Sequence, residues 1–400
     1  MADDVPTEVP NTVGQYVIIK TLGSGAFATV YMAQHTVTMA MVALKCIAKR
    51  KLRNQAEFEL LQREINLMRS MDHPFIASFF EVLDDEKNFY ISIEMVENGN
   101  LLDYINSNRG LQEQQARRIF CQLITVLSYL HVEKHVVHRD LKAENVLLDR
   151  NFNVRLVDFG LSKAFSKTDP FLQTTCGSPA YVAPEIIKEK PYTSAADIWS
   201  LGVLLYAMVV VTLPFNGDNI SFMLQQIISV NPPIPNSLSP ELRSLISRLL
   251  NKEPGARITL QEIIQHPWIS EFEDSKLMSE DFGLINTLKV VNPQELDSGV
   301  VSEMRILGYD TAGLLQELKS GAINQRTAAY KMFKRQRTIE EINNWQNVRA
   351  SRTKGGGGPE KETKLPALEN GILNGSPSVK PTPSKNFRPR LRYRSTVPVK

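Results

Sequence analysis

The chain has 400 residues, of which 42% are hydrophobic and 22% are charged. This composition is typical of a folded protein with a full-sized core, and it excludes collagen, a wholly disordered chain and a small disulfide scaffold. The net charge is +3, so the whole molecule is no polycation and we expect no nucleic-acid partner. The charge is nevertheless uneven, because residues 351–400 carry a net +8 and residues 1–350 a net −5.

Cysteine content and hydropathy indicate where the protein resides. Three cysteines, Cys46, Cys121 and Cys176, and a polar, acidic N-terminus without an export signal predict a reducing, intracellular setting. We therefore expect a cytoplasmic protein. The longest apolar stretch, residues 198–211, is about 14 residues long and falls short of the ~20 that span a bilayer. It predicts a buried core helix, and no transmembrane segment is expected.

The first part of the chain alternates between strand and helix patterns. After a disordered lead at residues 1–15, β-rich runs occur at 16–22, 28–33 and 41–47. Residues 55–68 then place apolar side chains at helical spacing, and helical patterns dominate from residue 101 to residue 269. The outline is an α+β fold with a small β-rich lobe followed by a larger helical lobe.

Helical patterns return after a linker expected at residues 270–289. Residues 290–336 form a small helical module, and a helical extension is expected at 337–350. Residues 351–400 are rich in Gly, Pro and basic residues and should stay unfolded. We interpret this tail as a solvated terminus; weak contact with acidic lipid, RNA binding and a nuclear address remain alternatives.

A glycine-rich segment, residues 23–28, joins the first two strand patterns. Its two glycines let backbone amides approach an anion, although glycine pairs are equally common in simple hairpin turns. In the next strand Lys45 lies among apolar residues, where a cation needs a partner. Glu64 flanks the buried face of the following helix. The sequence therefore predicts a Lys45–Glu64 pair that holds phosphate oxygens, with a structural salt bridge as the alternative.

Carboxylate, carboxamide and basic side chains lie close together in the segment His138-Arg139-Asp140-Leu141-Lys142-Ala143-Glu144-Asn145. Asp158-Phe159-Gly160 follows directly behind a short strand pattern. Asn145 and Asp158 supply the hard oxygen ligands that Mg²⁺ requires, and Asp140 is left to orient a hydroxyl and accept its proton. The segment Ala183-Pro184-Glu185 comes next along the chain.

In this order and spacing, the motifs resemble those of the eukaryotic protein kinases over about residues 16–269. The resemblance implies a bilobal kinase fold, with ATP and Mg²⁺ as cofactors and protein substrates as partners. It implies that Glu94 and Val96 contact the nucleotide through the hinge backbone, behind a gatekeeper at Ile93. The residues that would cover or enclose the nucleotide are Leu22, Gly23, Ser24, Gly25, Ala26, Phe27, Ala28, Thr29, Val30, Ala43 and Leu147.

The resemblance also implies a role for each catalytic residue. Lys45 would hold the α- and β-phosphates and be steered by Glu64, while Asn145 and Asp158 would bind Mg²⁺. Asp140 would be the catalytic base. Lys142 would meet the γ-phosphate, and its presence favours serine and threonine as acceptors. A pseudokinase-type nucleotide-binding scaffold is the alternative.

Two further features resemble the AMP-activated-protein-kinase-related enzymes of the calcium/calmodulin-dependent group. Thr174 resembles their activation threonine, which an upstream kinase or the protein itself would phosphorylate during signal transduction; Arg139 and Lys163 would bind the added phosphate. The module at 290–336 resembles a ubiquitin-associated domain, with Leu307-Gly308-Tyr309 as its short loop. A calmodulin target at the basic stretch 330–337 is an alternative.

Scaffold residues are implied as well. Asp197 would cap the catalytic-loop backbone, and Glu185 would pair with Arg257. Asn100 stands where related kinases that prefer an upstream basic residue often carry Glu, which weakens an expected preference for basic substrates.

Overall fold

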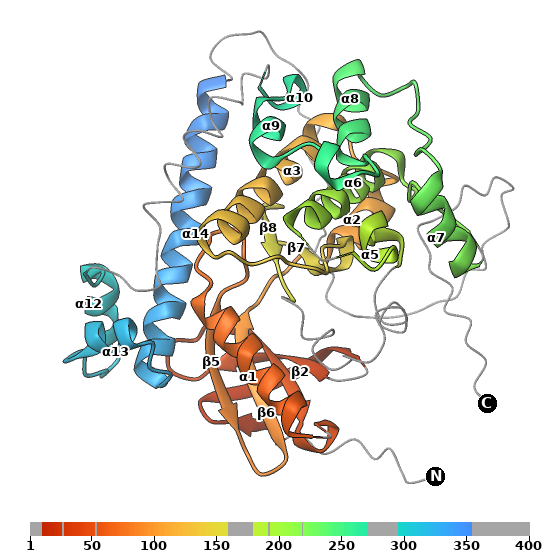
Figure 1. Ribbon diagram of the computed structural model, residues 1–400. Helices are drawn as coiled ribbons and strands as arrows, with labels where there is room; N and C mark the ends of the chain where they lie inside the picture. The colour runs from red at the N-terminus through yellow and green to blue at the C-terminus, as the bar shows by residue number, and fades with distance from the viewer. Residues whose placement is uncertain are drawn as a thin grey trace, which may run out of the picture.

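The computed structural model describes residues 10–25, 28–52, 54–158, 179–190, 193–217, 219–270 and 295–353, with the backbone alone for residues 345–353. Within these ranges the chain forms a β-rich lobe, a larger helical lobe and a group of appended helices (Figure 1). The long helix of the appended group runs beside both lobes. This arrangement confirms the expected α+β, two-lobed architecture.

The β-rich lobe is built on a six-stranded antiparallel sheet with the order β1-β2-β3-β4-β6-β5. Its strands are β1 (Thr12–Val13), β2 (Tyr16–Ser24), β3 (Ala28–His35), β4 (Met41–Ala48), β5 (Phe79–Asp84) and β6 (Asn88–Glu94). The three predicted strand runs are confirmed as β2, β3 and β4. Helix α1 (Gln55–Ser70) also occurs as predicted, and it begins where the Asn54 side chain accepts a hydrogen bond from the Glu57 amide. Leu61 and Ile65 anchor α1 on the sheet because both are buried in one cluster with Ile47 and Ile91.

The helical lobe surrounds one large apolar core. Its helices are α2 (Leu101–Asn108), α3 (Glu113–Ser128), α5 (Pro184–Ile187), α6 (Ser194–Val210), α7 (Ile220–Ser229), α8 (Pro240–Leu249), α9 (Leu260–Gln265) and α10 (Pro267–Ser270). A two-stranded sheet, β7 (Val146–Leu148) with β8 (Val154–Leu156), lies on the side of this lobe toward the β-rich lobe (Figure 1). The apolar stretch at 198–211 lies in α6, which is buried from Ala196 to Met208 as expected. None of the helices in the described ranges is long and apolar enough to cross a membrane.

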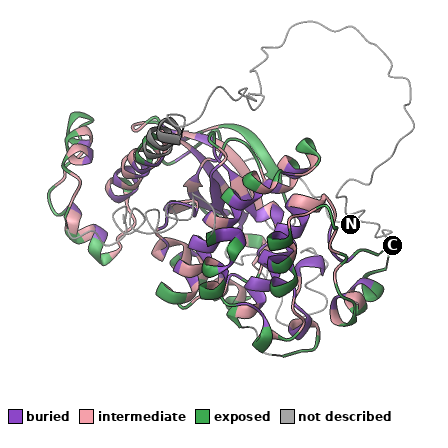
Figure 2. Ribbon diagram, turned by 90° about the horizontal axis from the view of Figure 1, so that it is seen from above, coloured by how far each residue is buried: buried purple, intermediate pink, exposed green. Residues whose placement is uncertain are grey.

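The appended helices are α12 (Ser298–Ile306), α13 (Leu314–Ser320) and α14 (Gln325–Thr353). They share a small core of Val300, Met304, Leu314, Leu318, Ala329 and Tyr330. The expected extension at 337–350 belongs to the same continuous helix as the end of the module, and α14 ends three residues beyond the expected end of that extension. Up to residue 344, α14 has both buried and exposed positions, as an amphipathic helix requires (Figure 2).

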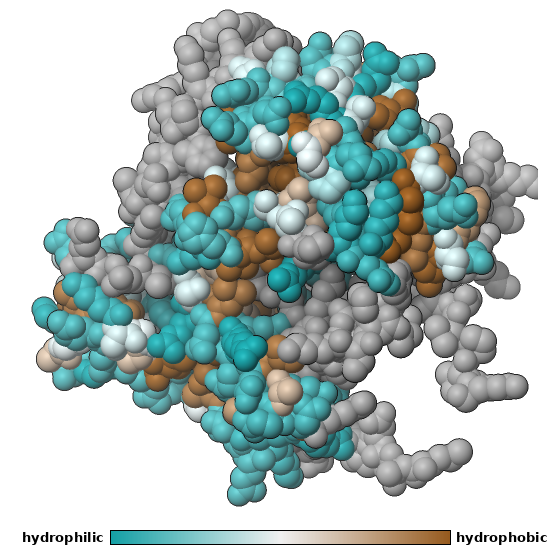
Figure 3. Space-filling view, in the orientation of Figure 1, coloured by the Kyte–Doolittle hydropathy of each residue, from teal (hydrophilic) through white to brown (hydrophobic). Residues whose placement is uncertain are grey.

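Helix α14 packs against the rear of the sheet through its apolar face. Ala328 and Met332 are buried in the same cluster as Val42, Leu44 and Tyr90 of the sheet. The outward faces of α12 and α13 are largely hydrophilic, whereas apolar residues show on the surface over α7 (Figure 3). Helix α14 therefore contributes to the core of the β-rich lobe.

The basic stretch at 330–337 is engaged inside the molecule. Tyr330 and Arg335 are buried, and the Lys334 Nζ donates to Asp297 Oδ2 at 3.0 Å. Arg337 pairs with the same carboxylate at 3.2 Å. In this conformation the stretch lacks the free basic and apolar faces that a calmodulin target presents.

Candidate nucleotide and phosphotransfer site

The glycine-rich segment is a β-hairpin formed by β2 and β3. Gly23 pairs with Val30 and Ser24 with Thr29, and the Gly25 amide donates to the Ala28 carbonyl at 2.8 Å. A Cβ added at Gly23 would meet no atom within 4 Å, so open space lies beside its backbone. Such a cradle suits a phosphate group. The hairpin tip, Ala26 and Phe27, lies outside the described residues.

Lys45 lies on β4 opposite Val30, beneath this hairpin. Its Nζ donates to Asp158 Oδ1 at 2.7 Å. The Lys45 ammonium holds the pKa of the Asp158 carboxyl below its ordinary value, and burial only partly opposes this effect. Asp158 adopts a φ of 57°, an uncommon conformation for a residue with a side chain and one found at active sites. The structure therefore brings the expected phosphate-binding cation and the expected metal ligand into direct contact.

Lys45 and Glu64 form no ion pair in this structure, where Asp158 is the partner of Lys45; the predicted Lys45–Glu64 pair stays a prediction. Among the described residues, Glu64 Oε2 is buried and has no hydrogen-bond partner. Burial raises the pKa of Glu64 to about 8, although Lys45 acts in the opposite direction. A carboxyl that is mostly protonated at neutral pH competes poorly with the ionised Asp158 for the ammonium group. A small cavity adjoins the Lys45–Asp158 pair. It is lined by these two residues and by Met68, Met71, Phe79 and Ile93, among others.

The catalytic-loop residues meet at one carboxylate. Asp140 Oδ2 accepts hydrogen bonds from Lys142 Nζ at 2.9 Å and from Asn145 Nδ2 at 3.1 Å. Asn145 Nδ2 also donates to the Asp140 carbonyl at 2.9 Å, which leaves its Oδ1 available as a ligand. The Val157 amide donates to the Asn145 carbonyl at 3.0 Å, so Asn145 and the residue before Asp158 are tied together. We call Lys45, Asp140, Lys142, Asn145 and Asp158 the front cluster.

Buried ionic groups support the catalytic loop from below. Asp197, in the first turn of α6, accepts hydrogen bonds from the His138 amide at 2.8 Å and the Arg139 amide at 3.0 Å. It therefore caps this backbone as expected. Arg139 has a φ of 68°, and the two bonds from its neighbourhood to Asp197 hold that strained conformation. Glu185 pairs with Arg257 at 2.7 Å, also as expected.

The hinge follows the end of β6, where the sequence places Glu94 and Val96. Beyond it, the Asn98 amide donates to the Leu148 carbonyl at 3.0 Å, and an isolated bridge joins Asn100 to Leu147. Leu147 thus lies on β7 at the hinge exit, whereas Ala43 lies on β4 beside Ile93. The two expected adenine neighbours come from opposite lobes, as a nucleotide placed between the lobes requires.

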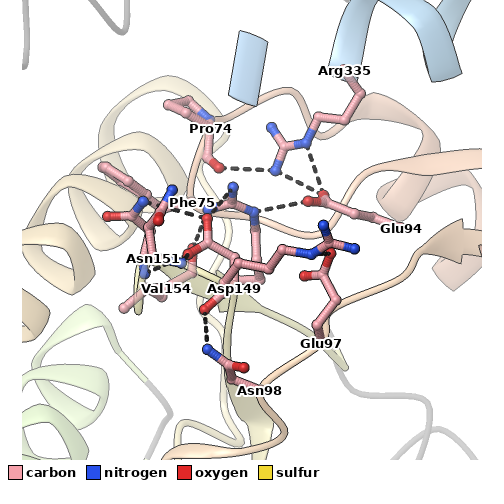
Figure 4. Close-up of polar contacts among 12 residues, drawn as sticks. Pro74, Phe75, Glu94, Glu97, Asn98, Asp149, Asn151, Val154 and Arg335 are labelled. Atoms are coloured by element: carbon pink, nitrogen blue, oxygen red, sulfur yellow. Dashed lines mark hydrogen bonds and ion pairs between the residues drawn. The ribbon is translucent and has the colours of Figure 1, made fainter. Parts of the chain in front are cut away.

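The side chain of Glu94 has a role that sequence reasoning missed. It binds two guanidinium groups, one from β8 and one from α14 (Figure 4). The signal in the sequence was an acidic residue at the end of an apolar strand. Its partners, Arg155 and Arg335, are distant in the chain, and only the fold reveals them.

Two regulatory residues cannot be placed. Thr174 and Lys163 lie outside the described residues, so the expected phosphate-binding set is represented by Arg139 alone. The described residues hold no cluster of three His, Cys, Asp or Glu that could bind a metal. The expected Mg²⁺ set, Asn145 and Asp158, instead combines a carboxamide with a carboxylate, which are the hard oxygen donors that this ion takes.

Comparison with known proteins identifies the family. A model of the protein kinase domain matches residues 16–269. The chain belongs to the protein kinase family. It is 39% identical to the SNF1-related protein kinase catalytic subunit alpha KIN12 of Arabidopsis thaliana, over 82% of the chain and 65% of that protein. The serine/threonine-protein kinase SIK1 of Rattus norvegicus is 37% identical, over 81% of the chain and 41% of that kinase.

These relatives confirm the resemblance to serine/threonine kinases of the SNF1-related and AMP-activated-protein-kinase-related type. The chain spans less than two thirds of the length of the curated relatives it matches first. The ubiquitin-associated character of residues 290–336 stays a prediction.

Proposed function

We propose that this kinase is active and transfers the γ-phosphate of ATP to serine and threonine hydroxyls of protein substrates, with Mg²⁺ as cofactor. The observation that carries the proposal is the convergence of Lys142 and Asn145 on the Asp140 carboxylate, beside the Lys45–Asp158 pair. A scaffold that only binds nucleotide has no need of this carboxylate. The arrangement therefore supports catalysis over the pseudokinase alternative.

Each group of the front cluster has a task in the reaction. Asp140 orients the substrate hydroxyl and accepts its proton as the hydroxyl oxygen bonds to the γ-phosphorus and the bond to the ADP oxygen breaks. Lys142 offsets negative charge on the transferred group. Asn145 Oδ1 and the Asp158 carboxylate would hold Mg²⁺, which neutralises phosphate charge when bound. In the active arrangement Lys45 turns from Asp158 to the nucleotide phosphates, and Glu64 becomes its partner.

We also propose that phosphorylation of Thr174 by an upstream kinase activates the protein. The added phosphate carries about −1.5 to −2 charges and would bind Arg139 and Lys163. Because Arg139 is tied to Asp197 through its backbone, such a phosphate would act directly on the catalytic loop. Thr174→Ala is expected to lower activity, and an enzyme that remains fully active with this change would contradict the proposal.

The appended helices are proposed to act as a ubiquitin-associated type of module that supports the kinase lobes. This proposal rests on the burial of Ala328 and Met332 in the core of the sheet. Residues 351–400 are proposed to make at most weak contact with acidic lipid. Titration with ubiquitin is expected to give no binding, and saturable binding would contradict the supporting role.

The test is transfer of labelled phosphate from ATP·Mg²⁺ to a library of serine peptides. Asp140→Asn should lower transfer by about 10²- to 10⁴-fold, the usual contribution of a catalytic base, and should leave nucleotide binding intact. Asp84→Asn is a matched control, since this carboxylate pairs with Lys49 at the surface and is 59% exposed. A wild-type chain that binds nucleotide but transfers no phosphate, even when Thr174 is phosphorylated, would support the scaffold instead.

A further inference from the structure

Four buried charged residues meet behind the hinge, and we call Glu94, Asp149, Arg155 and Arg335 the rear network (Figure 4). Glu94 Oε1 accepts from Arg155 Nε, and Glu94 Oε2 accepts from Arg335 Nε, both at 2.8 Å. Arg155 Nη2 donates to Asp149 Oδ2 at 2.9 Å. The side chains are between 0% and 9% exposed, so water cannot replace any of these contacts.

The charges of the rear network balance only when α14 is present. The two kinase lobes supply two carboxylates and one guanidinium, and α14 supplies the second guanidinium. Burial alone would raise the pKa of Glu94, but Arg335 and Arg155 outweigh it and hold this pKa below its ordinary value. Without Arg335, Glu94 and Asp149 would share a single cation in a buried site, which is unfavourable.

Arg335 also binds the loop between α1 and β5. Its Nη2 donates to the carbonyls of Pro74 and Ile76, each at 2.9 Å. The same loop is joined to β8, because the Leu156 amide donates to the Phe75 carbonyl at 2.9 Å. Two residues beyond Leu156 the chain reaches Asp158. The Arg335 guanidinium therefore joins the end of the hinge strand to the loop after α1. Through that loop it is connected to β8, which precedes the expected metal ligand in the chain.

We propose that Arg335 is a positioning residue of the nucleotide site. From its place on α14, Arg335 sets the distance between the hinge backbone and Asp158. The inference rests on the proposed function, in which the hinge holds the adenine and Asp158 holds the metal on the phosphates. A nucleotide contacts both ends at once, so its affinity depends on how rigidly the two ends are spaced. Arg335 itself touches no substrate.

The experiment measures binding of a fluorescent ADP analogue with Mg²⁺ to the full chain. Arg335→Gln should weaken binding about tenfold, as a coupling between contacting groups allows. Arg335→Lys keeps the charge and should recover part of the loss. Adding Glu94→Gln to Arg335→Gln should also recover affinity, because the opposite charges of Asp149 and Arg155 are then the only ones left in the network and cancel. In steady state the KM for ATP should rise with the dissociation constant, and kcat should change by less than about threefold.

Arg337→Gln is the matched control on the same helix. Arg337 pairs with Asp297 and Glu303 of the appended helices and is a third exposed, so its loss should leave nucleotide affinity unchanged. Thermal unfolding of every variant separates altered binding from failure to fold, and the charge-balanced double variant keeps the test valid if Arg335→Gln unfolds.

Three results would overturn the inference: wild-type affinity in Arg335→Gln, no recovery in the double variant, or a higher kcat at unchanged affinity. The last result would mean that α14 inhibits the kinase. A wild-type chain that binds no nucleotide would instead refute the proposed function.

Discussion

The front cluster and the rear network use the same kinds of side chain in opposite ways. At the front, Asp158 is 47% exposed and contacts a single cation, so one of its oxygens is open to a ligand. At the rear, Arg155 is fully buried and binds Glu94, Asp149 and the Val154 carbonyl. The charges that we propose for the chemistry keep acceptor positions free, whereas those of the rear network have their hydrogen-bonding positions filled.

Removing a front charge should therefore abolish activity and spare the fold. Asp158→Asn is expected to lower kcat by about 10³- to 10⁴-fold, because the metal loses a ligand that bears charge. The unfolding temperature should shift little, since the variant gives up only one partly exposed pair with Lys45. Peptide phosphorylation and thermal unfolding check the two halves of this prediction. A large loss of stability would contradict the prediction and would mean that Asp158 stabilises the fold, as the residues of the rear network do.

Removing a rear charge should instead lower stability and leave kcat nearly unchanged. Arg155→Met leaves Glu94 and Asp149 buried with one cation between them, and we expect a loss of about 3–4 kcal/mol in the free energy of unfolding. Urea denaturation measures it. Arg150→Met is the control, because Arg150 is 78% exposed and pairs with Glu97 at the surface. It should cost at most about 1 kcal/mol. Equal costs for the two variants would refute the contrast between a saturated interior and an open surface.

The two regions also differ in how well sequence predicts them. Asp140, Lys142 and Asn145 lie within six residues, so one local segment carries their mutual geometry. Glu94 and Arg335 are 241 positions apart, and the basic character of residues 330–337 suggests an exposed face until the fold buries it. The predicted strands and helices are confirmed because their apolar spacing is local.

Glu64 shows why sequence alone does not fix the partner of Lys45. Sequence spacing brings Glu64 and Asp158 to the same cleft, but it does not decide which carboxylate contacts Lys45. That choice depends on where α1 lies, and the appended helices contribute to its position. Arg69 of α1 donates to the Ser320 carbonyl at the end of α13, and Ile323 packs on the cluster that contains Leu61.

The buried Glu64 carboxyl makes a third prediction, intermediate in size. Its pKa is about 8 in the folded protein and ordinarily 4.5. The folded protein therefore retains a proton that the unfolded chain releases, so this contribution to stability is complete below about pH 4.5 and is lost as pH rises through 8. Between pH 5.5 and 7.5 it should fall by about 2–3 kcal/mol.

Glu64→Gln is the control, because glutamine has no carboxyl group to titrate. The difference in unfolding free energy between the wild type and this variant should change across the pH range, as followed by urea denaturation at three pH values. Parallel curves would mean that Glu64 is already ionised, and hence that it pairs with Lys45 in solution.

The smallest expected effect lies at Asn100, where the hinge exit enters α2. Its Oδ1 accepts a hydrogen bond from the Asp103 amide at 2.8 Å, so it caps the helix. Asn100→Ala should cost about 1 kcal/mol in the free energy of unfolding, and Asn100→Ser should cost less because serine also caps. Neither change should alter kcat, since Asn100 does not belong to the front cluster. If Asn100→Ala shifts peptide preference at unchanged stability, the residue contacts substrate, and the open, functional region extends beyond the front cluster to the hinge exit.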